Sequence, residues 1–328
     1  SVHQAVELLF PKAGTSPSSR SHYALLRRLY ELSNTPGWAY RTAFLRKRDG
    51  ARRTLHIPDH ELRDVQRRVL AEILSRAELP DCAAAYRPGA DLRDGTAPHV
   101  GKPVLVKMDI SHFFDSITFD MVLSRAFPSR YFPQPVGVLL AKLCCYHGRL
   151  PQGAPTSPAL SNMVMAPFDA YMSSYCEARG IAYTRYCDDM SFSGDFPPGP
   201  LIEKVRRFLN AMGFAVNEKK TRVLRQDRRQ TVTGVVVNQK RQVPASYRRK
   251  IRQEMYYCGK YGIRSHVLRT GQMAYVTDCS KSHDGKRVYQ RRFARHLLGK
   301  ISYALCVNPE DAEMRAYRDE CVCWLERS

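Results

Sequence analysis

The pattern of apolar and polar positions predicts helices that alternate with short strands along most of the 328 residues. Residues 104–110, VLVKMDI, combine β-branched and long apolar side chains, which indicates a buried strand. Residues 184–194, TRYCDDMSFSG, have the character of a β-hairpin centred on two acidic residues. Apolar side chains recur at helical spacing over residues 201–212 and stop before Gly213, so we expect a helix there.

The rest of the chain extends this pattern on both sides. The first 45 residues combine apolar helical patches with a Ser/Pro-rich loop, a basic hairpin is expected over 40–58, and a helix over 60–76. Further helices are expected over 118–127 and from residue 158, with strands over 214–216 and 231–237. From Ser246 onward the chain is helical and basic. This order predicts an α+β fold in which an antiparallel sheet is backed by helices.

The charge of the chain narrows the choice of partner. Lys and Arg number 52 against 31 Asp and Glu, a formal net charge of +21, which indicates a polyanion because neutralised phosphates release condensed counterions. Nucleic acid is the first candidate and an anionic membrane the second. No apolar run is long enough to span a bilayer and no secretory signal pattern is present, so we expect a cytoplasmic protein without a membrane partner. The ten cysteines form no Cys-x-x-Cys pair, which predicts reduced, mostly buried thiols and no zinc site.

The acidic pair Asp188 and Asp189 is unexpected in so basic a chain. Two like charges about 5 Å apart repel by about 3 kcal/mol at an effective dielectric constant near 20, so a cation should compensate them. Asp109 stands near the end of the expected strand over 104–110, and all three carboxylates converge if that strand and the hairpin are neighbours. Mg²⁺ prefers such oxygen ligands, and two ions can clamp both oxygens of a phosphoryl transfer. A solvated turn is the alternative for an isolated acidic pair.

Four stretches, in this order and spacing, resemble the reverse transcriptase family of right-hand polymerases: VLVKMDISHFFDSI, LPQGAPTSPALSN, YCDD and GFAVNEKKT. The match runs from about Lys47 to Asn238. The resemblance implies an N-terminal helical extension over 1–45, fingers and palm over 46–240, and a helical thumb that binds RNA or duplex over 241–328. It also implies two Mg²⁺ ions as cofactors, with Mn²⁺ as a substitute, and dNTPs as substrates.

The same resemblance implies roles for individual residues of the palm. The metal ligands would be Asp109, the backbone carbonyl of Ile110, Asp188 and Asp189. Phe114 resembles the steric gate whose ring collides with a ribose 2′-OH, the group that distinguishes RNA from DNA precursors. A plain core aromatic is the alternative for Phe114.

Other residues are assigned to the nucleotide, the leaving group and the nucleic acid. Gln152 resembles a residue that lines the nucleotide pocket, although a simple turn residue is the alternative. Arg53 and Lys47 resemble finger residues that hold the triphosphate, with solvated surface charge as the alternative for Lys47. Lys220 resembles the residue that protonates the leaving pyrophosphate, and Lys219 is an equal contender by sequence. Primer, template or RNA contacts are expected at Tyr186, Cys187, Val232, Thr233, Gly234, Arg248, Arg249 and Arg252.

One stretch indicates the type of reverse transcriptase. Residues 231–239, TVTGVVVNQ, resemble the V-T-G signature of bacterial retron enzymes. Those enzymes carry N-A-x-x-H ahead of the first palm strand, whereas residues 95–99 read GTAPH and share only His99. The resemblance implies copying of a bound, structured noncoding RNA into RNA-linked single-stranded DNA, in antiphage defence with an effector protein. A group II intron-like or other defence-associated reverse transcriptase is the alternative enzyme, and an RNA-binding scaffold with a vestigial site is the alternative of another class.

Overall fold

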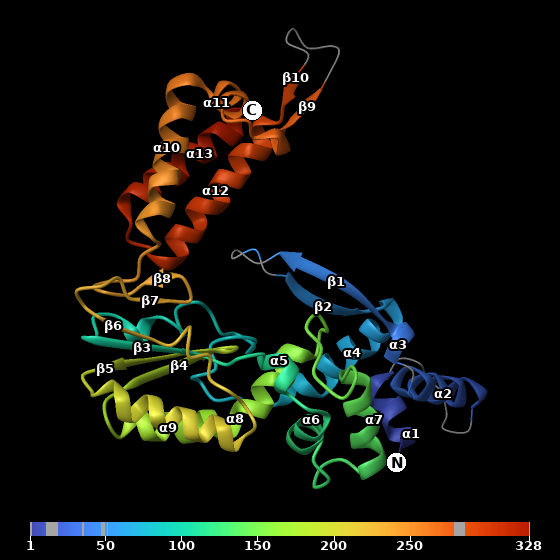
Figure 1. Ribbon diagram of the computed structural model, residues 1–328. Coiled ribbons are helices and arrows are strands. Elements are labelled where there is room, and N and C mark those ends of the chain that lie inside the picture. The colour runs from blue at the N-terminus through green and yellow to red at the C-terminus, as the bar shows by residue number, and fades with distance from the viewer. Residues whose placement is uncertain are drawn as a thin grey trace. The chain divides into compact units, whose positions relative to one another are not determined.

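Two compact units make up the chain, and each is described by itself (Figure 1). The first unit comprises Ser1–Pro98 and Pro103–Leu224, and the second comprises His99–Lys102 and Arg225–Ser328. The computed structural model describes residues 2–10, 19–34, 36–46, 50, 52–278 and 286–327. Lys47 lies outside the described residues, and so do residues 48 and 49 of the hairpin expected over 40–58. The division into extension, fingers with palm, and thumb stays a prediction.

A four-stranded sheet forms the centre of the first unit, in the order β4-β5-β3-β6 within the described residues. Its strands are β3 (Val104–Asp109), β4 (Ala182–Tyr186), β5 (Asp189–Gly194) and β6 (Arg222–Arg225). Both β3 and β4 pair with β5 in antiparallel fashion. The expected strand over 104–110 and the expected hairpin over 184–194 are therefore neighbours, and the predicted antiparallel sheet is confirmed.

Two helices cover one side of this sheet, α8 (Ser157–Glu177) and α9 (Pro198–Ala211) (Figure 1). The predicted apolar stripe of α9 is confirmed, because Leu201, Val205 and Leu209 are its buried residues. Buried side chains of the strands and of α8 belong to the same core, among them Val106, Phe192, Leu160 and Phe168. Full burial of a side chain of this size contributes about 1.5–3 kcal/mol, so this layer holds the sheet in place.

The first unit contains further α-helices and strands, and a side-chain cap marks the start of two of these helices. These further elements are α1 (Val2–Leu9), α2 (Arg20–Asn34), α3 (Pro36–Ala39), β1 (Tyr40–Arg46), β2 (Arg52–Pro58), α4 (His60–Glu72), α5 (Phe113–Ser116), α6 (Phe119–Ala126) and α7 (Gln134–Cys144). Asp59 caps α4 by accepting a hydrogen bond from the Leu62 N–H at 2.8 Å, and Thr118 caps α6 in the same way. The hairpin expected over 40–58 is confirmed as β1 paired with β2.

The second unit is mainly helical, as the sequence predicts. It contains β7 (Thr231–Val232), β8 (Val235–Val236), α10 (Ala245–Tyr261), α11 (Ile263–Arg269), β9 (Val276–Asp278), β10 (Lys286–Val288), α12 (Gln290–Val307) and α13 (Ala312–Arg327). α12 packs against α10 and α13, and the apolar faces of α10 and α12 are buried at Ile251, Met255, Leu297 and Ile301. No helix within the described residues has both the length and the apolar character that a bilayer crossing requires.

Two strand predictions need correction. Residues 231–237 form a tight hairpin rather than one strand, because Thr233 and Gly234 have left-handed backbone angles of φ 46° and 86° and turn the chain back. Residues 214–216 do not form a regular strand. Val216 makes one isolated bridge to Ile110, while the next segment, β6, completes the sheet.

Candidate active site

The register of the sheet brings three predicted carboxylates together. Asp109 is the last residue of β3 and lies directly opposite Asp189, the first residue of β5. Residues that face each other in an antiparallel pair have Cα atoms about 5 Å apart. Asp188 precedes Asp189 in the turn, and its backbone carbonyl accepts a hydrogen bond from the Ile110 N–H at 3.2 Å. One end of the sheet therefore holds all four predicted metal ligands, Asp109, Ile110, Asp188 and Asp189.

A two-residue turn places Asp188 at the tip of the β4–β5 hairpin. Tyr186 pairs with Asp189, so Cys187 and Asp188 are the central residues. Cys187 has φ 60°, and a positive φ at the first central residue is typical of a type II′ turn, where glycine is the usual choice. Cys187 is buried and Tyr186 is exposed. The surrounding structure therefore has to hold the Cys187 backbone in a conformation that L-residues seldom adopt.

One lysine balances part of the negative charge. The Lys220 Nζ contacts Oδ2 of the buried Asp109 at 2.8 Å, and this hydrogen bond raises the pKa of Lys220. Burial raises the pKa of Asp188, and the charge of Asp109 raises it further. Burial also raises the pKa of Asp189, although the charge of Lys107 opposes the effect. The two hairpin carboxylates are therefore held at a cost in free energy that a bound cation would relieve.

The donor chemistry fits a divalent cation, because carboxylate and carbonyl oxygens are the ligands that Mg²⁺ prefers. Within the described part of the chain, however, no set of three or more His, Cys, Asp or Glu side chains has the arrangement of a formed metal site. The cation that Asp109 contacts is the ammonium of Lys220. The carboxylates therefore lie close to one another, but their side chains are not arranged as the ligands of one metal ion are.

The predicted nucleotide-binding residues lie on neighbouring segments of the first unit. Phe114 is in the short helix α5, half-buried, with its ring against Phe113 at 5.4 Å between centroids. The loop that holds Gln152 is tied to β2, because the His56 N–H donates to the Gln152 carbonyl at 2.7 Å. Arg53 is an exposed residue of β2, and Lys47 lies outside the described residues.

The predicted RNA contacts of the second unit have mixed surroundings. Val232 is buried, and Thr233 and Gly234 form the turn between β7 and β8. Arg249 is exposed on α10. Two of the predicted RNA-binding arginines have acidic partners within the unit. Arg248 contacts Asp311 and Glu313, and Arg252 contacts Glu313. Much of the charge of those two arginines is therefore balanced inside the unit.

None of the sequence motifs indicates the buried ion pair that lies beneath the hairpin. Arg185 of β4 and Asp169 of α8 contact each other with both side chains fully shielded from solvent. Tyr183 adds a hydrogen bond from its hydroxyl to Asp169 at 2.8 Å. The sequence does contain a signal for this pair. Arg185 and Asp169 are each a single charge within an apolar segment, and a buried charge needs a partner of opposite sign.

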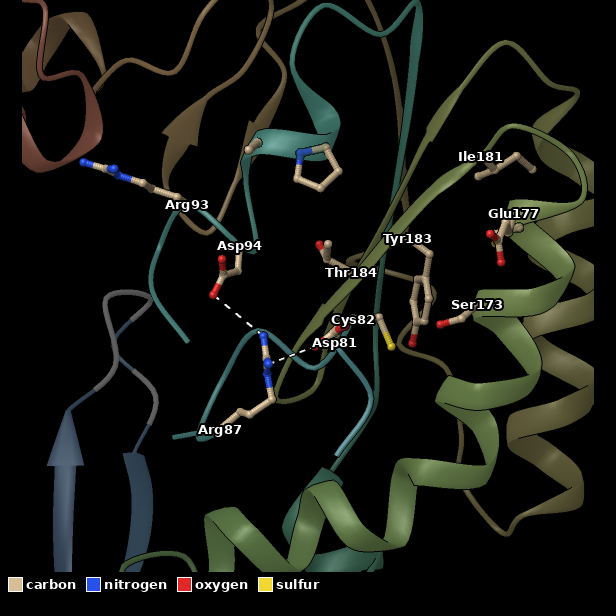
Figure 2. A pocket seen from close by; sticks show the side chains of 13 residues that line it. Asp81, Cys82, Arg87, Arg93, Asp94, Ser173, Glu177, Ile181, Tyr183 and Thr184 are labelled. Atoms are coloured by element: carbon tan, nitrogen blue, oxygen red, sulfur yellow. Dashed lines mark hydrogen bonds and ion pairs between the residues drawn. The ribbon is translucent and has the colours of Figure 1, made fainter. Parts of the chain in front are cut away.

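A pocket of about 680 Å³ opens beside β4 and α8, on the sheet edge that β4 forms (Figure 2). Arg87 forms ion pairs with Asp81 at 2.9 Å and with Asp94 at 3.7 Å. Figure 2 shows Arg87 between these two acidic residues, with Tyr183 and Ser173 on the opposite side. None of the residues predicted for catalysis or nucleotide binding lines this pocket. It adjoins the strand that carries Arg185 and is separate from the carboxylates.

Comparisons with known proteins agree with the geometry. Residues 45–242 match the family described as reverse transcriptase (RNA-dependent DNA polymerase). The chain is 32% identical over 327 residues to the retron Mx65 reverse transcriptase of Myxococcus xanthus, which covers 93% of this chain and 69% of that protein. It is 29% identical over 260 residues to the retron Ec86 reverse transcriptase of Escherichia coli, with 76% and 80% covered. The chain belongs to the retron reverse transcriptases and is an RNA-directed DNA polymerase of that type.

Proposed function

We propose that this reverse transcriptase copies part of a structured noncoding RNA that it binds, and that the product is single-stranded DNA linked to that RNA. The observation that carries the catalytic part of the proposal is the register that sets Asp109 opposite Asp189, beside Asp188. The net charge of +21 supports a long-lived complex with RNA, because each neutralised phosphate releases counterions.

Asp109, Asp188, Asp189 and the carbonyl of Ile110 would hold two Mg²⁺ ions, or Mn²⁺ in their place. When bound, such ions supply positive charge that stabilises the attacking and leaving oxygens of nucleotidyl transfer. Lys220 keeps its proton at neutral pH, because its hydrogen bond to Asp109 raises its pKa. A protonated ammonium beside the carboxylates suits a donor to the departing pyrophosphate, and this contact favours Lys220 over Lys219.

Other side chains of the first unit would select and hold the dNTP. Phe114 would exclude a ribose 2′-OH by steric collision, Gln152 would line the nucleotide pocket, and Arg53 would hold the triphosphate with Lys47. The exposed ring of Tyr186 and the turn residue Cys187 would lie against the primer end.

Contacts to RNA or duplex are proposed for the second unit. They comprise Val232, Thr233 and Gly234 of the β7–β8 hairpin and Arg248, Arg249 and Arg252 of α10. Arg249 suits a phosphate contact best, since it is exposed and the other two have acidic partners. A role in antiphage defence with an effector protein is proposed from family membership alone.

Sequencing of the nucleic acid that copurifies with the full chain tests the RNA and product proposals. We expect one RNA species and a DNA complementary to part of it, joined so that ribonuclease digestion leaves ribonucleotides on the DNA. In primer extension, the copurified RNA should be a much better template than an unrelated RNA of equal length. Equal use of both templates would contradict the retron-type reaction and favour an intron-like enzyme.

A further inference from the structure

The buried ion pair beneath the hairpin has the geometry of a bidentate clamp. The Arg185 Nε donates to Asp169 Oδ1 at 2.8 Å, and Nη2 donates to Oδ2 at 2.5 Å. Both side chains have no solvent exposure. Burial lowers the pKa of Arg185, but the hydrogen bond and charge of Asp169 more than offset this, so the guanidinium is held charged. Asp169 therefore fixes both the charge and the plane of the Arg185 side chain.

The remaining nitrogen of the guanidinium reaches the catalytic turn. Nη1 donates to the backbone carbonyl of Cys187 at 2.9 Å and to Oδ1 of Asn162 at 3.1 Å. The Cys187 carbonyl belongs to the peptide group that begins Asp188. Because a peptide group is planar, fixing its oxygen also fixes the nitrogen and Cα of Asp188. The guanidinium thus acts one peptide plane away from the Asp188 carboxylate.

The backbone of Arg185 is also fixed. Its N–H donates to the Cys82 carbonyl at 2.7 Å, and its carbonyl accepts from the Ala84 N–H at 2.9 Å. Asn162 reaches the same loop, since its Nδ2 donates to the Ala85 carbonyl at 2.7 Å. Arg185 is therefore held at its backbone by one loop and at its side chain by α8. A side chain held in this way can impose a conformation on the turn.

Fold stability alone is a poor explanation for this arrangement. A buried ion pair gives little net stability, because the loss of hydration of both charges offsets their attraction. The turn, in contrast, needs an external support, since Cys187 has φ 60° without being glycine. Arg185 provides such a support, because its guanidinium donates a hydrogen bond to the carbonyl of Cys187, the strained residue of the turn.

We propose that Arg185 is a positioning residue for nucleotidyl transfer: anchored by Asp169, it fixes the Cys187–Asp188 peptide and thereby the Asp188 carboxylate. The proposal rests on the metal-binding role proposed for Asp188. It makes the pair Arg185 and Asp169 part of the catalytic geometry, although neither side chain touches the substrate.

Arg185→Lys tests the proposal, because lysine keeps the charge but lacks the fork that reaches Asp169 and Cys187 together. Steady-state incorporation of a dNTP is measured on an RNA template annealed to a DNA primer. We expect kcat to fall on the order of 10²-fold, as for a misplacement near 1 Å, with KM for the dNTP nearly unchanged. The Mg²⁺ concentration for half-maximal rate should rise, while circular dichroism and binding of the RNA–DNA duplex stay those of the wild type.

Leu209→Ala provides the matched control, since this fully buried residue of α9 lies in the same unit and forms no part of the turn. It should lower the melting temperature while kcat per folded molecule and the Mg²⁺ requirement stay unchanged. If Arg185→Lys does not fold, Asp169→Asn is tested instead. This isosteric substitution removes the charge that anchors the guanidinium, so we again expect a lower kcat with KM for the dNTP nearly unchanged.

The proposal is overturned if the folded Arg185→Lys or Asp169→Asn variant has the kcat and the Mg²⁺ dependence of the wild type. Such a variant would differ from the wild type in melting temperature alone, as Leu209→Ala should. Failure of the proposed metal site gives a different result. In that case Asp188→Asn would itself retain activity, whatever Arg185→Lys does. Loss of activity in Asp188→Asn together with wild-type kinetics in Arg185→Lys would reject only the positioning role.

Discussion

Asp188→Asn should stabilise the metal-free protein while it destroys polymerase activity. Asp188 is a largely buried carboxylate whose pKa is raised by burial and by the charge of Asp109. Its charged form therefore opposes folding at neutral pH. Asparagine has nearly the same shape and carries no charge, so the substitution removes the repulsion without opening a cavity.

The magnitude follows from the sheet register. Asp189 faces Asp109 across the sheet with Cα atoms about 5 Å apart, and Asp188 is the residue before Asp189. Two carboxylates at a spacing of about 5–6 Å would repel by about 3 kcal/mol at an effective dielectric constant near 20. The ammonium of Lys220, 2.8 Å from Asp109, offsets part of this energy. We therefore expect Asp188→Asn to raise the free energy of unfolding by about 1–3 kcal/mol in the absence of metal.

Urea unfolding followed by circular dichroism measures this effect, in EDTA and in excess Mg²⁺. In EDTA the variant should be the more stable protein, whereas Mg²⁺ should stabilise the wild type more than the variant. A raised folded-state pKa costs stability above the unfolded-state value, so the difference should vanish as the pH falls below about 4. Asp195→Asn, at an exposed position after β5, should change stability by less than about 0.5 kcal/mol.

Two results would refute this reasoning. One is a variant that is less stable than the wild type in EDTA, which would mean that the charge of Asp188 is well compensated without metal. The other is an equal stabilisation of both proteins by Mg²⁺, which would mean that the ion binds elsewhere.

Three further predictions concern other residues. Phe114→Ala should increase ribonucleotide incorporation relative to deoxyribonucleotide incorporation by 10-fold or more in single-nucleotide extension. This ratio corresponds to a loss of about 1.4 kcal/mol or more of discrimination between the two sugars. An unchanged ratio would favour the alternative that Phe114 is a plain core aromatic. Burial raises the pKa of the Cys187 thiol to about 12, so iodoacetamide at neutral pH should modify the exposed Cys306 and Cys323 first, and mass spectrometry that finds Cys187 modified first would contradict its burial. Burial lowers the pKa of the His99 imidazole to about 4, so the folded state favours the neutral imidazole. The stability that this neutral form provides is complete above about pH 6.5 and falls by about 3 kcal/mol as the pH drops to 4. Urea unfolding of His99→Gln should lack this part of the acid sensitivity, and an identical pH profile in both proteins would refute the assignment.

Local periodicity was enough to predict most elements of the first unit. The apolar stripe of α9 and the β-branched run of β3 both have the residue types that favour their observed structure. Short strands were harder to predict, because a bridge of one residue such as Val216 depends on a partner that lies far away in the sequence. For the same reason the sequence does not indicate β6, and its β-branched run over 231–237 predicts one strand where the structure has a hairpin.

The candidate site shows the same division between local and distant information. The acidic residues could be found from the sequence, because charge in an apolar segment is conspicuous and the order of motifs is specific. The ion pair of Arg185 with Asp169 joins residues 16 positions apart on a strand and a helix, and its geometry follows only from tertiary packing. Likewise, the acidic partner that Arg252 finds in Glu313 is 61 residues away and could not be predicted from helical spacing.

Single-nucleotide incorporation by the purified full chain tests the central claim most directly, that Asp109, Asp188 and Asp189 together hold the metal ions of polymerisation. The wild type should extend a DNA primer on an RNA template in Mg²⁺ and stop when EDTA is added, and Asp109→Asn and Asp188→Asn should each be inactive although folded. Extension by either variant at the wild-type rate, or extension that continues under chelation, would contradict the account.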